Sequence, residues 1–175
     1  MAEVHVVGAI CGAKGWPGSA NLFCRFEIVA GDHWKLIEGA ASGQTQTDDP
    51  ADGEHCVWNH PLDLHYVTNA VSGWPRFRCE VYHVDRTTGK HELDGYGFVF
   101  MPTAPGTYTL DCVTWALQTP SMMDRLWTWL SGLQPQLRTL DTVSSPNDRY
   151  CLNTTSRGHV ILEVTVVLRH FERYA

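Results

Sequence analysis

Four side chains of the kinds that bind zinc lie close together in one stretch of the sequence: His55, Cys56, His60 and His65. Zinc binds imidazole nitrogen and thiolate sulfur, but its known structural sites use ligand pairs at short spacings that this set lacks. In an extended chain, the odd spacing places His55 and His60 on opposite faces. We therefore interpret the four residues as ordinary surface or core side chains and predict no metal site.

The sequence also lacks the motifs that would indicate covalent or hydrolytic catalysis. It has no G-x-S-x-G nucleophile elbow, no H-E-x-x-H zinc motif and no phosphate-binding P-loop. The spacing of its cysteines, histidines and aspartates gives no reason to expect that they converge. We predict a protein that is not an enzyme, with no catalytic residues and no cofactor.

Size and charge narrow the class of protein further. The 175 residues are most simply one domain, residues 1–175, and a chain of this length buries about 70% of its unfolded surface without metal or disulfide staples. The net charge of -6 opposes general attraction to nucleic acid and to anionic lipid. The six cysteines are widely spaced, which predicts reduced, buried thiols in a cytoplasmic protein. We expect neither a signal peptide nor a transmembrane segment.

Alternation of apolar and polar residues recurs along the chain and predicts strands with one buried face. The strongest case is His159–Leu168, where every second residue from Val160 is apolar. In contrast, the proline in Glu54–Tyr66 predicts two short extended pieces there. Many strands separated by turn signals indicate an all-β fold, an antiparallel β-sandwich of about eight strands.

One segment, Thr119–Leu133, breaks this rhythm and predicts a short inserted helix. Thr119 and Pro120 suit the first positions of a helix and Gly132 suits its end. Its apolar residues form two adjoining stripes, although a helix lying on one sheet needs only one. Two interpretations stay open: the helix is wedged between two parts of this chain, or it exposes a partner-binding surface. The residues of that surface would be Met123, Trp127 and Leu130, with Trp129 from the adjoining stripe.

The stretch Arg76–Pro102 resembles the third loop of C2 domains, which are β-sandwiches that bind calcium and phospholipid. The pattern of that loop is V-x-D-x-D, a basic stretch, and then D-x-I-G before a buried strand. Val81–Asp85 and Lys90–Gly95 are similar to it, with His83 in place of the first aspartate. The resemblance implies a C2-like sandwich and a long loop before a buried strand at Tyr96–Met101.

Calcium binding, which a C2 resemblance suggests, has little support in these residues. Calcium takes about six to eight oxygen ligands, several of them carboxylates from two converging loops. The first loop, Gly12–Leu22, contains no acidic residue, and Lys90 lies among the acids of the third loop. We therefore expect solvated loop acids rather than a calcium site at Asp85, Glu92 and Asp94.

Further stretches, spread over essentially the whole chain, resemble the B9 domain family, a divergent C2-like branch. The resemblance implies a scaffold of the ciliary transition zone and basal body, a part of the cytoskeleton, which takes part in ciliogenesis. It also implies assembly with other B9 proteins, namely B9 domain-containing protein 1 and the Meckel syndrome type 1 protein. The stretches are Trp58-Asn59-His60-Pro61-Leu62-Asp63, Gly73-Trp74-Pro75-Arg76, Gly95-Tyr96-Gly97-Phe98, Pro105-Gly106-Thr107, Asp148-Arg149-Tyr150 and Leu168–Tyr174.

A second functional hypothesis is a peripheral membrane module that binds phospholipid headgroups without calcium. Arg76 and Arg78 project from one face of a predicted strand, and Trp16 lies in the glycine-rich first loop. Glu80 shares the face of the two arginines, however, which favours a solvated face with ion pairs. A tryptophan in such a loop more often folds back onto the rim of the sandwich.

Overall fold

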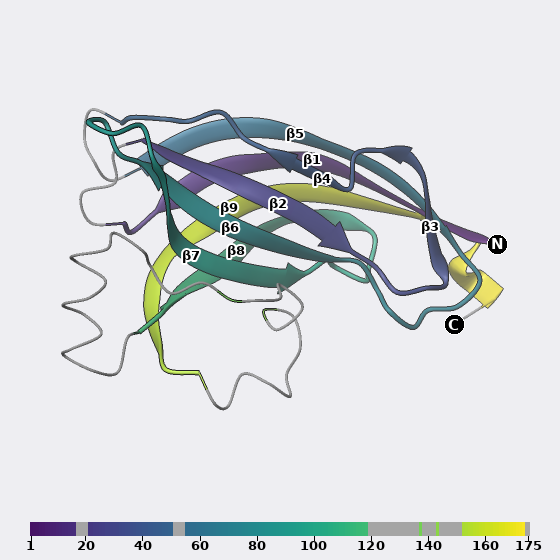
Figure 1. Ribbon diagram of the computed structural model, residues 1–175. Helices are drawn as coiled ribbons and strands as arrows, with labels where there is room; N and C mark the ends of the chain where they lie inside the picture. The colour runs from purple at the N-terminus through teal and green to yellow at the C-terminus, as the bar shows by residue number, and fades with distance from the viewer. Residues whose placement is uncertain (17–20, 51–54, 119–136, 138–142, 144–151, 174–175) are drawn as a thin grey trace.

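The computed structural model is an antiparallel β-sheet of nine strands, and it describes residues 1–16, 21–50, 55–118, 137, 143 and 152–173 (Figure 1). No helix in this part of the chain is both long and apolar enough to cross a bilayer. The elements are β1 Ala2–Lys14, β2 Leu22–Val29, β3 Trp34–Gly39, β4 Ser42–Gln44, β5 His55–Thr68, β6 Arg76–Val84, β7 His91–Phe100, β8 Gly106–Leu117, β9 Thr154–Arg169 and the 3₁₀ helix η2 Phe171–Arg173.

The strand order is β3-β5-β1-β9-β8-β7-β6-β2-β4, so two strands that follow each other in the chain, β3 and β4, form the two edges. The sheet curls on itself, and its two halves face each other as the layers of a C2-like sandwich. The halves meet at β7 and β8, which pair only at Tyr96 with Trp115 and at Gly97 with Thr114. The predicted sandwich is confirmed, with nine strands in the part of the chain described here.

The core lies between the two halves and is built from the inward-facing residues of both. Alternate residues of β9 are buried from Val160 to Val166, as predicted, and β2 likewise buries every second residue from Leu22 to Ile28. Trp58 of β5 fills the space between the halves, and its indole Nε1 donates a hydrogen bond to the carbonyl oxygen of Leu22, 3.1 Å away. This bond ties one half of the sheet to the other.

Bulges cross the middle of the sheet and help it to curl. The register of β1 shifts between Ile10 and Gly12 against both of its neighbours, and that of β8 shifts between Val113 and Trp115. At Gly12 the neighbouring strand comes so close that an added Cβ would lie 1.9 Å from the carbonyl oxygen of Cys56. Bulges bend a strand and increase its twist, so these shifts add to the curl of the sheet.

The structure differs from the predicted elements at β5 and β7. β5 is one continuous strand, so the prediction of two short pieces around Pro61 was wrong. The proline fits because β3 pairs with β5 only from Leu64 onward, which leaves Pro61 with a ladder on one side. β7 begins at His91, five residues earlier than the predicted buried strand Tyr96–Met101, so the preceding loop is short. The predicted helix Thr119–Leu133 lies outside the described residues.

Candidate functional site

Three loops meet at one end of the sandwich, on the left of Figure 1, and both chain termini lie at the opposite end. The amide of Val84 donates to the carbonyl oxygen of Asn21, and Leu22 forms a bridge with Asp48. An ion pair joins Arg86 to Asp49. These contacts fasten the β6–β7 hairpin to the end of the β1–β2 loop at Asn21 and to the β4–β5 loop at Asp49, and they join those two loops to each other.

The aspartates described at this end are engaged within the chain. The carboxylate of Asp48 accepts a hydrogen bond from the amide of Val57 at 2.8 Å, and Asp49 pairs with Arg86. Asp85 accepts bonds from the amide of Thr87 at 2.7 Å and from the hydroxyl of Thr88 at 2.9 Å. These hydrogen bonds lower the pKa of Asp85, and the bond from the Thr87 amide has the largest effect. Because the carboxylate binds groups of the turn that follows it, it stabilises the shape of the hairpin.

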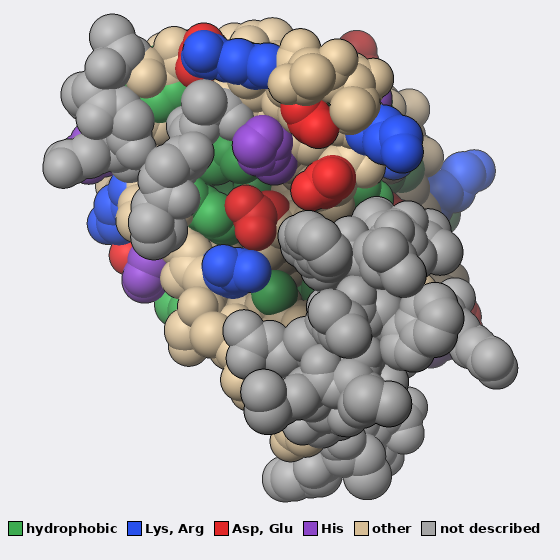
Figure 2. All heavy atoms as spheres, turned by 60° about the vertical axis from the view of Figure 1, so that its left-hand side comes forward, with side chains coloured by type: hydrophobic (Ala, Val, Ile, Leu, Met, Phe, Trp, Pro, Cys, Tyr) green, Lys and Arg blue, Asp and Glu red, His purple; other side chains and the backbone are tan. Residues whose placement is uncertain are grey.

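The other two acids of the stretch that resembles a C2 third loop, Glu92 and Asp94, lie on β7 and not in the loop. Glu92 stands opposite His83 in the β6–β7 ladder, and Asp94 forms an ion pair with Arg157 at 3.7 Å. Figure 2 views this end of the molecule and shows acidic, basic and histidine side chains intermingled on the described surface. The arrangement does not bring Asp85, Glu92 and Asp94 together as one set of ligands.

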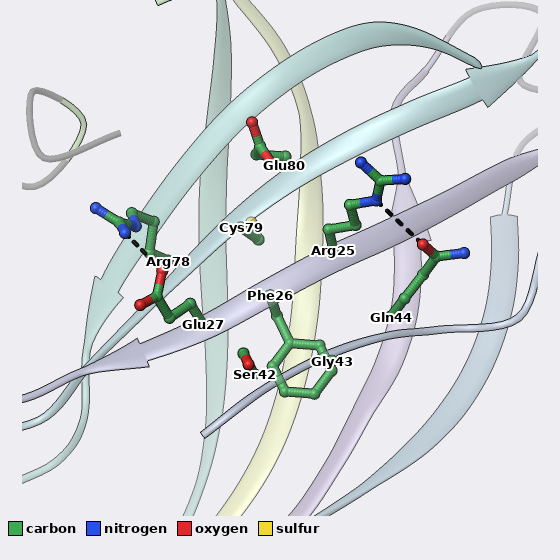
Figure 3. A pocket seen from close by; sticks show the side chains of 9 residues that line it. All are labelled: Arg25, Phe26, Glu27, Ser42, Gly43, Gln44, Arg78, Cys79 and Glu80. Atoms are coloured by element: carbon green, nitrogen blue, oxygen red, sulfur yellow. Dashed lines mark hydrogen bonds and ion pairs between the residues drawn. The ribbon is translucent and has the colours of Figure 1, made fainter. Parts of the chain in front are cut away.

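A groove of about 330 Å³ lies on the sheet near β4, over β2 and β6 (Figure 3). Charges alternate along it, because Arg25 stands opposite Glu80 and Glu27 stands opposite Arg78. Arg78 is only 7% exposed and its Nη2 donates to Glu27 Oε2 at 2.6 Å. The groove is therefore lined by two positive and two negative side chains. Such a lining is better suited to a neutral polar ligand than to a negatively charged phosphate group.

Arg25 is held by aromatic and polar neighbours. Its Nε donates to Gln44 Oε1 at 3.1 Å, and its guanidinium lies 4.8 Å from the centre of the Tyr82 ring. Tyr82 in turn stacks on Phe23, with ring centres 5.3 Å apart. A cation over an aromatic face gains about 0.5–1 kcal/mol at an exposed site, so these contacts fix the guanidinium in place.

Glu80 gives the groove a pH dependence that can be measured. Burial raises the pKa of Glu80, against the attraction of Arg25 and Arg78 and a hydrogen bond with Tyr82. The folded protein therefore binds this proton more tightly than the unfolded chain. The resulting stabilisation is complete below the unfolded-state pKa and is lost as the pH rises through the folded-state pKa.

We expect Glu80→Gln, which has no charge at any pH, to increase the free energy of unfolding slightly at pH 7. Urea denaturation between pH 4 and pH 8 measures this, and the difference from wild type should grow as the pH rises. Glu27→Gln is the matched control, because it removes the partner of Arg78 and should destabilise the protein at pH 7. A Glu80→Gln difference that does not change with pH would contradict the assignment.

The three residues considered for lipid binding lie apart or are enclosed. Arg76 and Arg78 share one face of β6, as predicted, and Arg78 is bonded to Glu27, as expected of a face with ion pairs. Trp16 is only 3% exposed and packs in the core, with Gly158 below its ring. The structure therefore does not gather Arg76, Arg78 and Trp16 on one open surface.

A second apolar cluster lies on the outer side of β7 and β8. Leu93, Tyr96 and Trp115 are buried there together with Val143, and Leu137 packs against them. The amide of Leu137 donates a hydrogen bond to the Tyr96 hydroxyl at 3.0 Å. The connection from β8 to β9 is thus anchored on these two strands through Leu137 and Val143. The predicted partner-binding residues Met123, Trp127, Trp129 and Leu130 belong to the same connection but lie outside the described residues.

The four histidine and cysteine residues of the stretch from His55 to His65 are dispersed in the fold. His55 is exposed, Cys56 is buried in the core, and His60 packs edge-on against Phe26. His65 instead stacks on His5, a contact between residues far apart in the chain that the spacing in the sequence could not predict.

Four of the five described cysteines are buried free thiols, as predicted, and the sulfurs of Cys79 and Cys112 lie 3.9 Å apart. The hydrogen bond with Cys79 and burial raise the pKa of Cys112, while, against the opposing effect of its bond with Cys112, a hydrogen bond with Cys24 and burial raise the pKa of Cys79. Both sulfurs are also buried, which is typical of structural thiols.

Comparisons with known proteins agree on one family. The family model described as "Ciliary basal body-associated, B9 protein" matches residues 4–167. The chain is similar to B9 domain-containing protein 2 of Danio rerio, with 44% identity over 99% of this chain and 98% of the relative, and to that of Homo sapiens, with 45% identity over the same shares. It is also similar to B9 domain-containing protein 1 of Xenopus laevis, with 26% identity over 97% of this chain and 86% of the relative.

Proposed function

Because the chain belongs to the B9 domain family of ciliary basal body-associated proteins, we propose that it is a non-enzymatic scaffold of the ciliary transition zone and basal body. It assembles there with B9 domain-containing protein 1 and the Meckel syndrome type 1 protein and serves ciliogenesis. The observation that carries the proposal is the extent of the family match, which takes in nearly the whole sequence. In the matched part, the surfaces of the B9 domain itself must then make the contacts with partners.

The connection between β8 and β9 is the surface that we propose for partner binding. It contains Trp127, Trp129, Leu130 and Met123, and aromatic side chains of this kind supply much of the energy of protein interfaces. Leu137 and Val143 hold the connection against Tyr96 and Trp115, so it has a fixed base on the sheet. The part of the connection that the structure describes, Leu137 and Val143, is thus attached to the sandwich at β7 and β8.

Co-expression with B9 domain-containing protein 1 and the Meckel syndrome type 1 protein, followed by size-exclusion chromatography, tests this proposal. We expect the wild type to elute with its partners and the double variant Trp127→Glu, Leu130→Lys to elute alone as a folded protein. Replacing an apolar residue that is buried at an interface by a charged one weakens the free energy of binding by several kilocalories per mole. Assembly should therefore fail. Val71→Asp, at an exposed position 44% accessible, is the control and should assemble normally.

Two outcomes would count against the proposal. If the wild type does not elute with either partner, the scaffold function itself is wrong. If the wild type assembles and the folded Trp127→Glu, Leu130→Lys variant also assembles, the surface is wrong, and the exposed edge strand β3 becomes the next candidate.

Headgroup binding has weaker support as an alternative function. Arg78 is enclosed by Glu27, Trp16 is buried, and the net charge of -6 opposes anionic lipid. Flotation with vesicles containing anionic lipid, in the absence of calcium, is expected to leave the isolated protein in the aqueous fraction. Flotation that is lost in an Arg76→Ala, Arg78→Ala variant would instead support the membrane function.

A further inference from the structure

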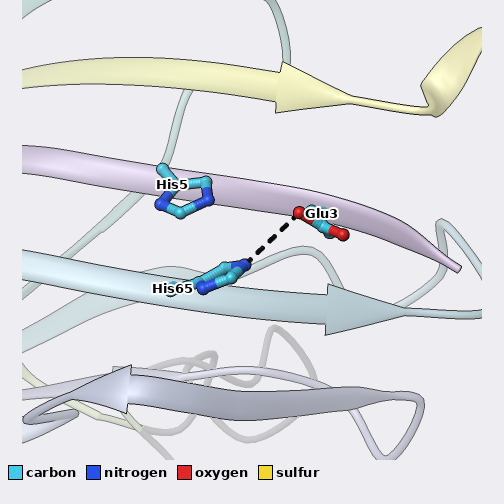
Figure 4. Close-up of side chains that lie close together, drawn as sticks. All are labelled: Glu3, His5 and His65. Carbon is cyan, nitrogen blue, oxygen red and sulfur yellow. Dashed lines mark ion pairs between the residues drawn. The ribbon is translucent and has the colours of Figure 1, made fainter.

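Three side chains that are common metal ligands meet on the outer face of β1 and β5, near the end that carries both termini (Figure 4). His5 and His65 stand directly opposite each other in the β1–β5 ladder, and Glu3 lies two residues before His5 on the same face. One ligand atom from each of the three lies within 4.8 Å of the others. No other such group of three histidine, cysteine or acidic residues occurs in the described part of the chain.

The two imidazoles are close, and one of their nitrogens lacks a partner. The rings of His5 and His65 are stacked, with centres 3.8 Å apart and planes at 21°. His65 Nε2 is buried and has no hydrogen-bond partner; the nearest acidic atom, Glu3 Oε2, is 3.7 Å away, beyond hydrogen-bond range. Leaving a buried polar atom without a hydrogen-bond partner costs free energy. Binding of a metal ion to this nitrogen would remove that cost.

We propose that Glu3, His5 and His65 bind one zinc ion, each histidine through a ring nitrogen and Glu3 through a carboxylate oxygen. Two nitrogen ligands suit zinc and related transition metals, whereas calcium and magnesium prefer oxygen. Three protein ligands leave the fourth position of a tetrahedral ion open to solvent, which lies on the outer side of these strands. Neither the family match nor the proposed scaffold function supplies this site.

Small side-chain movements suffice to form the site. Ligand bonds of about 2.1 Å in a tetrahedron place ligand atoms about 3.4 Å apart, so the side chains must close by roughly an ångström and the rings must turn out of their stack. The backbone of both strands can stay in place, because the ladder already fixes His5 opposite His65.

Neighbouring charges modulate the site. Arg169 Nη1 lies 3.5 Å from Glu3 Oε2, and its side chain is 67% exposed, so it is free to swing away when a cation arrives. Its positive charge nevertheless opposes binding. On the other side, Glu38 of β3 stands opposite His65 and adds a negative charge. A bound ion would link β1 to β5 and so hold the first strand in the sheet.

Isothermal titration of the chelator-treated full chain with zinc chloride tests the proposal. We expect one zinc ion per chain with micromolar affinity, a rise in melting temperature with zinc, and no heat with calcium chloride. His5→Phe and His65→Phe keep an aromatic ring in the stack but remove the ligand, and each should weaken binding at least about tenfold, as should Glu3→Gln. Arg169→Gln should tighten binding.

His55→Phe is the matched control, because His55 is an exposed histidine on the same strand and the same face as His65. It should bind zinc as the wild type does. Circular dichroism verifies that each variant is folded, and Glu3→Gln gives a surface variant if a histidine variant does not fold. The proposal is overturned if the wild type fails to bind zinc below millimolar concentration, or if folded His65→Phe and Glu3→Gln bind it as tightly as the wild type.

Discussion

Trp58→Ala is expected to lower the free energy of unfolding by about 3–5 kcal/mol, the usual range when a large buried aromatic residue is removed. Trp58 is 1% exposed and stands between the two halves of the sheet. Its removal leaves a cavity that side chains on rigid strands fill only in part. It also deletes the hydrogen bond from the indole to the carbonyl oxygen of Leu22, which joins the two halves.

Urea denaturation followed by circular dichroism measures this loss. Val57→Thr, at the neighbouring residue with 56% exposure, is the control and should change the free energy of unfolding by no more than about 0.5 kcal/mol. Trp58→Phe retains much of the volume and should fall between the two. A loss below about 1 kcal/mol for Trp58→Ala would contradict a central place for this side chain in the core.

Gly158→Ala should have the second largest effect, a loss of about 3 kcal/mol from forced overpacking. A Cβ at this residue would lie 2.1 Å from the Trp16 ring and 2.3 Å from the carbonyl oxygen of Lys14. Neither contact is possible without movement, and Trp16 is itself buried in the core at 3% exposure. The added methyl group must therefore push Trp16 outward or shift β9 against β1.

A double-mutant cycle with Trp16→Ala separates these two responses. If the methyl group displaces the Trp16 ring, Trp16→Ala should cost much less in the Gly158→Ala background than in the wild type. Gly95→Ala is the matched control, since a Cβ there meets Thr114 at an ordinary contact distance of 3.5 Å. Additive losses would indicate that β9 moves and that Trp16 keeps its place.

The pattern of apolar residues was sufficient to predict most of the sandwich. In β9, alternation identified which residues face the core, because in a strand with one buried face every second side chain must point to that face. The motifs resembling B9 domains were spread along the chain, and the family they indicated is confirmed. Local rules failed at Pro61, because whether a proline interrupts a strand depends on the neighbour that pairs beside it.

Contacts across strands were beyond what the sequence could predict. The pairing of Glu27 with Arg78 and the stack of His5 on His65 both depend on the register of strands far apart in the chain. Register is set by bulges and turns acting together, and no single stretch encodes it. The residues near His65 in the sequence that could share a metal with it are His55, Cys56 and His60, whereas in the fold its ring stacks on His5 of the first strand.

The neighbouring positions of the first and last strands determine how the fold responds to mechanical force. β1 and β9 run antiparallel from Glu3 opposite Arg169 to Lys14 opposite His159, and both termini leave at the same end. Tension between the two ends would therefore open this ladder like a zipper, breaking its hydrogen bonds one after another rather than all at once. We expect the domain to unfold at low force when it is stretched by its two ends. It should resist force better when only one terminus is attached to a neighbouring structure.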